Sequence, residues 1–309
     1  MYPWLQDIEA EFSERLRGGR MAHAIMVSGP EGLGKTELGR AFLASLLCLE
    51  DGYPACGHCR SCQLLGTGAH PEGHILTFEP HPKRDVMRTE LIVDQVRRLT
   101  AALQLTNSVS RRKAALAYPA ESLNASAANA LLKTLEEPPG DAVLILVSHN
   151  PSRLPATVRS RCQSLHVRLP DSDVSIPWLS EAAQVAPDEA ALALEAAAGS
   201  PLRALRILRE EGIEPYRALG ELLDGLRSGR VDPPTAMSAL AEVDPELLWS
   251  WLSLRSAHET RARLDHGALA RALAQLQIEA DRNRRLLATP VRKDLLLQDW
   301  LIQWARLSE

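Results

Sequence analysis

Short apolar segments alternate with amphipathic ones over roughly the first half of the chain. Continuous apolar runs predict strands at residues 23–28, 74–78, 113–117, 143–147 and 164–167. Segments with apolar residues at helical spacing lie between them, at residues 35–47, 90–103 and 125–135. Pro138 and Pro139 end the last of these helices. This alternation is typical of an α/β layered domain with a parallel sheet.

After residue 170 the pattern changes. Strand signals vanish, and Leu and Ala recur at helical spacing, with Gly or Pro near residues 199–201, 212 and 232–234. We therefore expect an α/β domain at 1–170, a small three-helix domain at 171–211 and a separate all-α domain at 212–309.

Composition and charge narrow the class of protein. The chain has 309 residues, 45% of them hydrophobic, which is enough for packed cores and excludes disorder as the dominant state. Its 35 Lys and Arg against 39 Asp and Glu give a net charge of −4, so any DNA contact must be local or shared with partners. No apolar run approaches the roughly 18 residues of a membrane span, and the N-terminus is acidic. We expect a soluble, cytoplasmic protein.

A phosphate-binding motif follows the first predicted strand. Residues 29–36 (GPEGLGKT) match G-x-x-x-x-G-K-[ST] and open the next predicted helix, as the mechanism requires. Glycines let backbone N–H groups face phosphate oxygens, Lys35 would reach the β- and γ-phosphates, and Thr36 would hold Mg²⁺. The alternative is a tight glycine turn without a ligand. The candidate residues for binding ATP or ADP with Mg²⁺ are Gly29, Gly32, Gly34, Lys35 and Thr36.

Hydrolysis of the nucleotide is not expected to be efficient. A P-loop ATPase normally places an Asp, usually beside a Glu, at the end of a second strand. Here Tyr118 and Pro119 follow the strand at 113–117. The first acid, Glu121, lies too far past that strand to be assigned the activation of water.

Four of the five cysteines fall within fifteen residues. Cys48, Cys56, Cys59 and Cys62 are spaced C-x7-C-x2-C-x2-C, and four thiolates can close a tetrahedral shell around a structural Zn²⁺. Two other interpretations stay open, namely reduced thiols at a helix end and a DNA-recognition element. The fifth thiol, Cys162, belongs elsewhere. The nearby histidines are expected to be solvated or part of the core: His58, His70 and His74.

Several motifs together resemble the AAA+ clamp-loader subunits of bacterial DNA polymerase III. They are the phosphate loop, the cysteine cluster (48–62), the stretch NALLKTLEEPP at 129–139 and Ser160-Arg161-Cys162. The resemblance covers residues 2–210. It implies a subunit of a heteropentameric machine that places a sliding clamp on primed DNA during replication, with gamma/tau and delta subunits as partners. It also implies that the chain is a subunit of a DNA-directed DNA polymerase holoenzyme, in which the polymerase is the nucleotidyltransferase.

Within this family the chain is similar to the delta-prime type. Residues 118–119 replace the acids of the motor subunits, and the opening 2–5 (YPWL) is also similar. The resemblance implies a stator in which Arg161 acts as an arginine finger on nucleotide bound to a neighbouring subunit, and in which 212–309 joins an oligomeric collar. Ser148 matches a nucleotide-sensing position, although a Ser at a strand end commonly forms a turn. The alternative is a gamma/tau-type motor ATPase.

Overall fold

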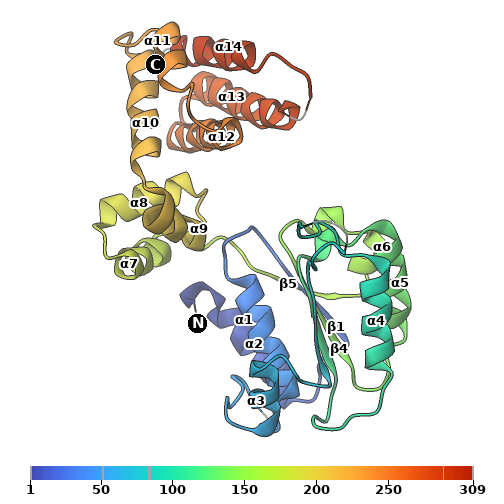
Figure 1. Cartoon of the computed structure of the whole chain (residues 1–309). Coiled ribbons are helices and arrows are strands. Elements are labelled where there is room, and N and C mark those ends of the chain that lie inside the picture. Colours follow the sequence, from blue (N-terminus) through green and yellow to red (C-terminus); the bar gives the residue numbers. More distant parts are fainter. Residues whose placement is uncertain (1, 51, 83–84, 288, 308–309) are drawn as a thin grey trace. The chain divides into compact units, whose positions relative to one another are not determined.

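The computed structural model describes residues 2–50, 52–82, 85–287 and 289–307, and the chain divides into two compact units, 1–170 and 171–309 (Figure 1). Position 51, inside the predicted knuckle at 48–62, lies outside the described residues. None of the helices within the described ranges combines the length and apolar character that crossing a lipid bilayer requires.

The first unit is built on the predicted parallel sheet. Its strands within the described residues are β1 (Ala24–Ser28), β2 (Gly73–Leu76), β3 (Ala114–Ala117), β4 (Val143–Ser148) and β5 (Gln163–His166). They are hydrogen-bonded in the order β2-β3-β4-β1-β5, and every neighbouring pair is parallel. The second strand ends two residues before the predicted limit of 78. Because Ser28 pairs with Ser148, the carboxyl ends of β1 and β4 lie side by side.

Helices cover both faces of this sheet (Figure 1). Side chains of a strand point alternately to opposite faces. In β1, Ile25 and Val27 belong to a core with α1 (Gln6–Arg17) and α2 (Lys35–Leu47). Met26 belongs to a second core with α4 (Val93–Leu103) and α5 (Ala125–Glu136). Both sheet faces are therefore buried, which explains the continuous apolar runs of the strands.

Capping residues determine where two of these helices begin. The prediction for α2 is confirmed at both ends. The prediction for α4 began at residue 90, whereas the helix begins at Val93, because the Gln95 side chain accepts a hydrogen bond from the Ile92 N–H at 2.9 Å. Asn124 caps α5 by accepting from the Ala127 N–H at 2.9 Å. The shorter elements are η1 (Pro3–Leu5), α3 (Arg60–Gly66), η2 (Ala120–Ser122), η3 (Pro151–Arg153) and α6 (Ala156–Arg159).

The second unit is helical throughout its described residues, as the Leu and Ala periodicity predicts. Its elements are α7 (Ser172–Ala183), α8 (Pro187–Ala196), α9 (Pro201–Arg206), η4 (Ile207–Glu211), α10 (Glu214–Arg227), α11 (Pro233–Ala239), α12 (Pro245–Ala262), α13 (Gly267–Leu286) and α14 (Lys293–Ala305). Trp300 and Trp304 on α14 are fully buried and stack with ring centroids 5.2 Å apart. One continuous apolar core joins α7–α9 to the later helices.

An ion-pair network links α8 and α10 to α12. Arg255 contacts Glu195 of α8 at 3.4 Å and Glu259 of its own helix at 3.0 Å. Glu259 in turn accepts a hydrogen bond from Arg227 of α10 at 3.1 Å. Since Glu259 is 5% exposed, solvent screens these charges little.

Candidate nucleotide site and metal centre

The predicted phosphate loop joins β1 to α2, as the motif requires. Gly29 has φ +143°, and a Cβ there would lie 2.1 Å from the Val167 carbonyl oxygen. Gly34 has φ +80°, and a Cβ there would lie 2.4 Å from the ring of Tyr2. Both the backbone conformation and the close contacts therefore require glycine at these two positions.

Lys35 points into this loop from the first turn of α2. Its side chain is buried, and its ammonium donates a hydrogen bond to the Pro30 carbonyl. Burial lowers the pKa of Lys35 to about 8, although the carboxylates of Glu121, Glu31 and Glu37 oppose this change. A buried cation that its acidic neighbours compensate only in part is suited to a phosphate group.

Three polar atoms without a hydrogen-bond partner gather at the end of β4. Among the described residues, Glu121 Oε2, Ser148 Oγ and His149 Nδ1 are buried and make no hydrogen bond. The second oxygen of Glu121, Oε1, accepts from the His149 backbone N–H at 3.0 Å. Since Ser148 pairs with Ser28, the residue before the phosphate loop, these atoms lie beside that loop. Buried polar atoms are nearly always hydrogen-bonded in proteins, so these three atoms are candidates to bind a ligand, an ion or water.

Glu121 is a residue that sequence reasoning set aside. The distance past β3 argued against it, but η2 turns the chain back so that its carboxylate reaches the end of β4 rather than β3. Tyr118, by contrast, is engaged elsewhere, because its hydroxyl accepts from the Arg40 guanidinium of α2. The only sequence signal for Glu121 was an acid within the turn after a strand, which is common in proteins without a nucleotide.

The N-terminal segment packs against the phosphate loop, which the sequence patterns did not predict. The indole of Trp4 donates to the Leu33 carbonyl at 3.0 Å, and the rings of Tyr2 and Trp4 stack at 5.1 Å. With Tyr2 lying against Gly34, these two aromatic residues brace the loop where it enters α2.

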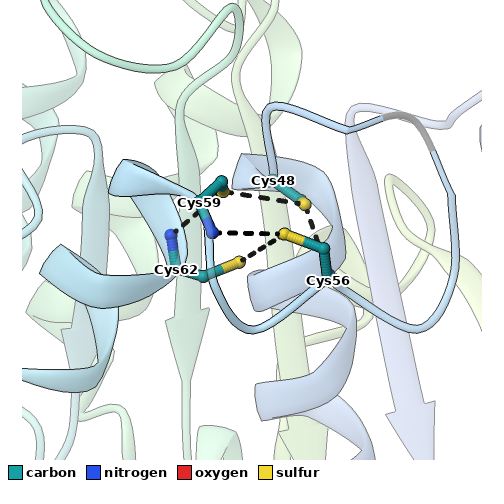
Figure 2. A group of neighbouring side chains, drawn as sticks. All are labelled: Cys48, Cys56, Cys59 and Cys62. Carbon is teal, nitrogen blue, oxygen red and sulfur yellow. Dashed lines mark hydrogen bonds between the residues drawn. The ribbon is translucent and has the colours of Figure 1, made fainter.

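The structure brings the four predicted metal ligands together (Figure 2). Ligand atoms of Cys48, Cys56, Cys59 and Cys62 all lie within 4.8 Å of one another, so the cluster could hold a metal ion. The Sγ atoms of Cys48 and Cys59 are 4.0 Å apart, and those of Cys56 and Cys62 are 3.9 Å apart. Tetrahedral zinc with Zn–S bonds of about 2.3 Å separates its sulfurs by about 3.8 Å. The spacing suits zinc, and the cysteines are free thiols rather than disulfides.

Backbone hydrogen bonds favour ionisation of one of these thiols, Cys59, whereas burial raises the pKa values of Cys56 and Cys62. The Cys59 N–H points at Cys56 Sγ at 3.4 Å, and the Cys62 N–H points at Cys59 Sγ at 3.5 Å. Burial raises the pKa of Cys59, but hydrogen bonds from the N–H groups of Leu49 and Cys62 and from neighbouring thiols outweigh it and lower the pKa to about 6. Hydrogen bonds of this kind stabilise the thiolate, which is the form that binds a metal.

The other candidate ligands are less suited to a metal. Glu50 and His58 lie 3.6 Å apart near Cys56, but both are largely exposed. Cys162 is outside the cluster and donates to the Val158 carbonyl at 3.3 Å, and burial raises its pKa to about 11. The cluster of four cysteines is the better donor set.

Arg161 follows α6 and is partly exposed. One terminal nitrogen of its guanidinium lies 2.6 Å from Glu136 Oε1 of α5, and the other donates to the Thr157 carbonyl at 3.0 Å. Arg161 therefore makes the intramolecular ion pair that is the ordinary role of a surface arginine. Such a pair, with side chains 35% and 49% exposed, is worth only about 0–1 kcal/mol and can be exchanged for another anion.

The fold and the phosphate loop define a class of protein. A parallel sheet of order β2-β3-β4-β1-β5, a P-loop between β1 and α2, and a following helical unit are the arrangement of an AAA+ P-loop protein. The family model described as "DNA polymerase III, delta subunit" matches residues 4–171. The chain belongs to the DNA polymerase III delta-prime family, since this model covers more than half of it and delta' subunits are 30–38% identical to it over 98% of its length.

Curated relatives show how much of the chain this family covers. The DNA polymerase III subunit delta' of Pseudomonas aeruginosa is 38% identical over 98% of this chain and 90% of that protein. The delta' subunit of Yersinia pestis is 30% identical over 98% of this chain and 95% of that protein. The tau/gamma subunit of Haemophilus influenzae is 33% identical, but over 50% of this chain and 22% of that protein. The gamma/tau alternative is therefore not better supported.

Proposed function

We propose that the chain is the delta-prime stator of a bacterial DNA polymerase III clamp loader, working in the cytoplasm. It would assemble with gamma/tau and delta subunits and help place a sliding clamp on primed DNA. The observation that carries this proposal is the 38% identity to a delta' subunit over 98% of the chain. In this proposal the helices at 171–211 form a lid, and those at 212–309 join the collar of the ring.

Arg161 would serve a neighbouring subunit rather than this chain. A guanidinium stays charged at neutral pH and can bridge phosphate oxygens in a planar fork. Glu136 would hold Arg161 until the neighbour's nucleotide takes over its charge, which costs little because their ion pair is exposed.

The chain's own P-loop would bind nucleotide and turn it over slowly. Lys35 would pair with phosphate oxygens, and the Thr36 hydroxyl with the Glu121 carboxylate would hold Mg²⁺. The buried, unpaired oxygens of Glu121 and Ser148 support this assignment, because a bound Mg·nucleotide would supply the partners they lack among the described residues. When bound, Mg²⁺ neutralises phosphate charge. The side chains at positions 118 and 119 supply no carboxylate, so turnover would be weak.

The four clustered thiolates would hold one structural Zn²⁺. A shell made only of protein ligands leaves no open position for water, so the ion would stabilise the fold rather than act in chemistry.

Reconstitution tests the proposed function. The full chain is mixed with its organism's gamma/tau and delta subunits, and loading of the clamp onto primed DNA is measured with and without this chain. We expect a stable complex that loads clamps only when the chain is present. Failure to assemble would contradict the proposal, and strong ATP hydrolysis by the chain alone that Lys35→Ala abolishes would favour the motor alternative.

A further inference from the structure

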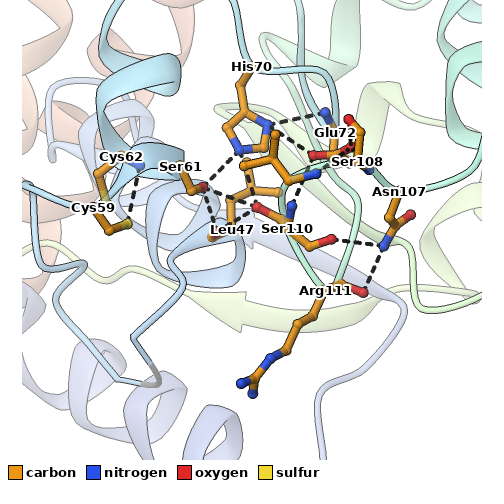
Figure 3. Close-up of polar contacts among 11 residues, drawn as sticks. Leu47, Cys59, Ser61, Cys62, His70, Glu72, Asn107, Ser108, Ser110 and Arg111 are labelled. Carbon is orange, nitrogen blue, oxygen red and sulfur yellow. Dashed lines mark hydrogen bonds and ion pairs between the residues drawn. The ribbon is translucent and has the colours of Figure 1, made fainter.

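A buried polar network lies behind the cysteine cluster (Figure 3). It joins Ser61, His70 and Ser110, which are 0%, 5% and 4% exposed. The Ser61 hydroxyl oxygen is 2.8 Å from His70 Nε2, the Ser110 hydroxyl oxygen is 3.2 Å from the same nitrogen, and the two hydroxyls are 3.1 Å apart. Because all three side chains are buried, water does not compete for these hydrogen bonds.

The positions of the hydrogens in this network follow from its acceptors. Both hydroxyls donate to the Leu47 carbonyl, Ser61 at 2.6 Å and Ser110 at 2.7 Å. Since a hydroxyl has one hydrogen, His70 must donate from Nε2 to the hydroxyl oxygens. Its Nδ1 then accepts from the Glu72 backbone N–H at 3.1 Å. Burial lowers the pKa of His70, although Glu72 opposes this change, so the ring is neutral in this tautomer.

Serine, histidine and glutamate side chains also make up hydrolase triads, but this network cannot act as one. Ser61 is inaccessible, and its hydrogen is donated to Leu47 rather than to the imidazole, so no base activates it. The Glu72 carboxylate lies 3.8 Å from His70 Nδ1, too far for a hydrogen bond, and it is held by a loop instead. It accepts from the backbone N–H groups of Ser108, Val109 and Ser110.

The network connects the two chain segments that carry the thiols. Leu47 is the last residue of α2 and directly precedes Cys48, and carbonyls at a helix C-terminus have no partner within the helix. Here two hydroxyls satisfy that carbonyl. One of them belongs to Ser61, in the first turn of α3 between Cys59 and Cys62. The same hydrogen bonds therefore fix Cys48 relative to Cys59 and Cys62.

We propose that the hydrogen bonds among Ser61, His70 and Ser110 position three of the four thiolates for a metal ion, with His70 and Ser110 supplied from outside the cysteine segment (48–62). The Glu72 carboxylate holds the backbone of Ser110, which aims its hydroxyl at the Leu47 carbonyl. Contacts outside the ligand shell that fix the ligands in place affect how tightly a site binds its metal. This inference rests on the proposed metal site.

The test is Ser110→Ala in the full chain, with Ser45→Ala as its matched control. Like Ser110, Ser45 is a buried serine, and it lies on α2. Among the described residues its hydroxyl makes no hydrogen bond that the substitution could remove. The Kd for Zn²⁺ is measured by competition with a chromogenic chelator. We expect Ser110→Ala to weaken Zn²⁺ binding about 10- to 100-fold and Ser45→Ala to leave it unchanged. Ser61→Ala removes the other donor to Leu47 and is expected to act like Ser110→Ala.

The possible outcomes distinguish a failure of this inference from a failure of the proposed metal site on which it rests. A wild-type chain that binds no Zn²⁺ would contradict the metal site and this inference with it. A wild-type chain that binds Zn²⁺ no more tightly than Ser110→Ala would overturn only the positioning role. Thermal unfolding distinguishes positioning from a general loss of stability: we expect Ser110→Ala to lower the Tm of the zinc-loaded chain more than that of the metal-free chain. Equal losses would contradict the inference.

Discussion

The buried ammonium of Lys35 should make the nucleotide-free protein less stable than a variant that lacks this charge. The pKa of Lys35 is lowered from 10.5 to about 8, and a pKa change of one corresponds to about 1.4 kcal/mol, so the buried charge costs about 3 kcal/mol at neutral pH. Lys35→Met removes the charge and keeps an unbranched side chain of similar length. We therefore expect this variant to be more stable than wild type by up to about 3 kcal/mol at about pH 7.

The pH dependence gives this prediction its sign. Between the folded pKa of about 8 and the ordinary value of 10.5, the folded protein has released the Lys35 proton while the unfolded chain still holds it. Wild-type stability therefore rises with pH through this window relative to Lys35→Met. The advantage of the variant is fully present below pH 8 and is lost as the pH approaches 10.5.

Urea unfolding of the first unit measures the difference. Hydrogen exchange of peptides from β1 and α2 reports on this unit alone, and Lys133→Met, at an exposed position of α5, is the control that should show no such pH-dependent gain. Mg·ATP should stabilise wild type and leave Lys35→Met unchanged. A Lys35→Met chain less stable than wild type at neutral pH, or a difference that does not change with pH, would refute the reasoning.

Three further predictions concern the ligands and the packing. The isolated chain should bind Mg·ATP, more weakly after Thr36→Ala, with negligible turnover; rapid hydrolysis would contradict this. Metal analysis of protein purified without added zinc or chelators should find one Zn²⁺ per chain, and its removal should destabilise the first unit; protein without zinc would exclude the site. Gly39→Ala would place a Cβ 2.9 Å from side-chain atoms of Leu116 and Val147, and it should lower the free energy of unfolding by about 1–3 kcal/mol. Gly66 has open space around it, so Gly66→Ala should be neutral or raise that free energy by up to about 1 kcal/mol. Urea midpoints check this pair, and equal shifts would contradict it.

Local patterns were sufficient to predict most of the first unit. The strands of a parallel sheet are buried on both faces, so residues 143–147 show as an uninterrupted apolar run. The phosphate motif marks both the end of β1 and the start of α2, since Gly34 must adopt a positive φ before Lys35 opens the helix. The cysteine cluster was equally visible, because its spacing is itself the chemical signal.

What the sequence did not show depends on contacts between distant segments. Tyr2 reaches Gly34 only because η1 turns the N-terminus onto the loop, and Glu121 reaches the end of β4 only through η2. Ser110 joins the Leu47 carbonyl across the fold, and no periodicity or motif marks a single serine for that role. The histidine of this network illustrates the same point: His70 was expected to be solvated or part of the core, and it is a buried member whose partners only the fold reveals.

Steady-state ATP turnover of the assembled clamp loader tests the central claim most directly. Wild type, Arg161→Ala and the control Arg159→Ala, a neighbouring exposed arginine, are each built into the complex with gamma/tau and delta partners. An arginine finger contributes roughly a thousandfold or more at the site it serves, a loss that the other motor sites dilute but do not hide. We predict that Arg161→Ala lowers turnover clearly while the complex still assembles, and that Arg159→Ala does not. An intact complex with unchanged turnover would contradict the role of Arg161 as a finger in trans.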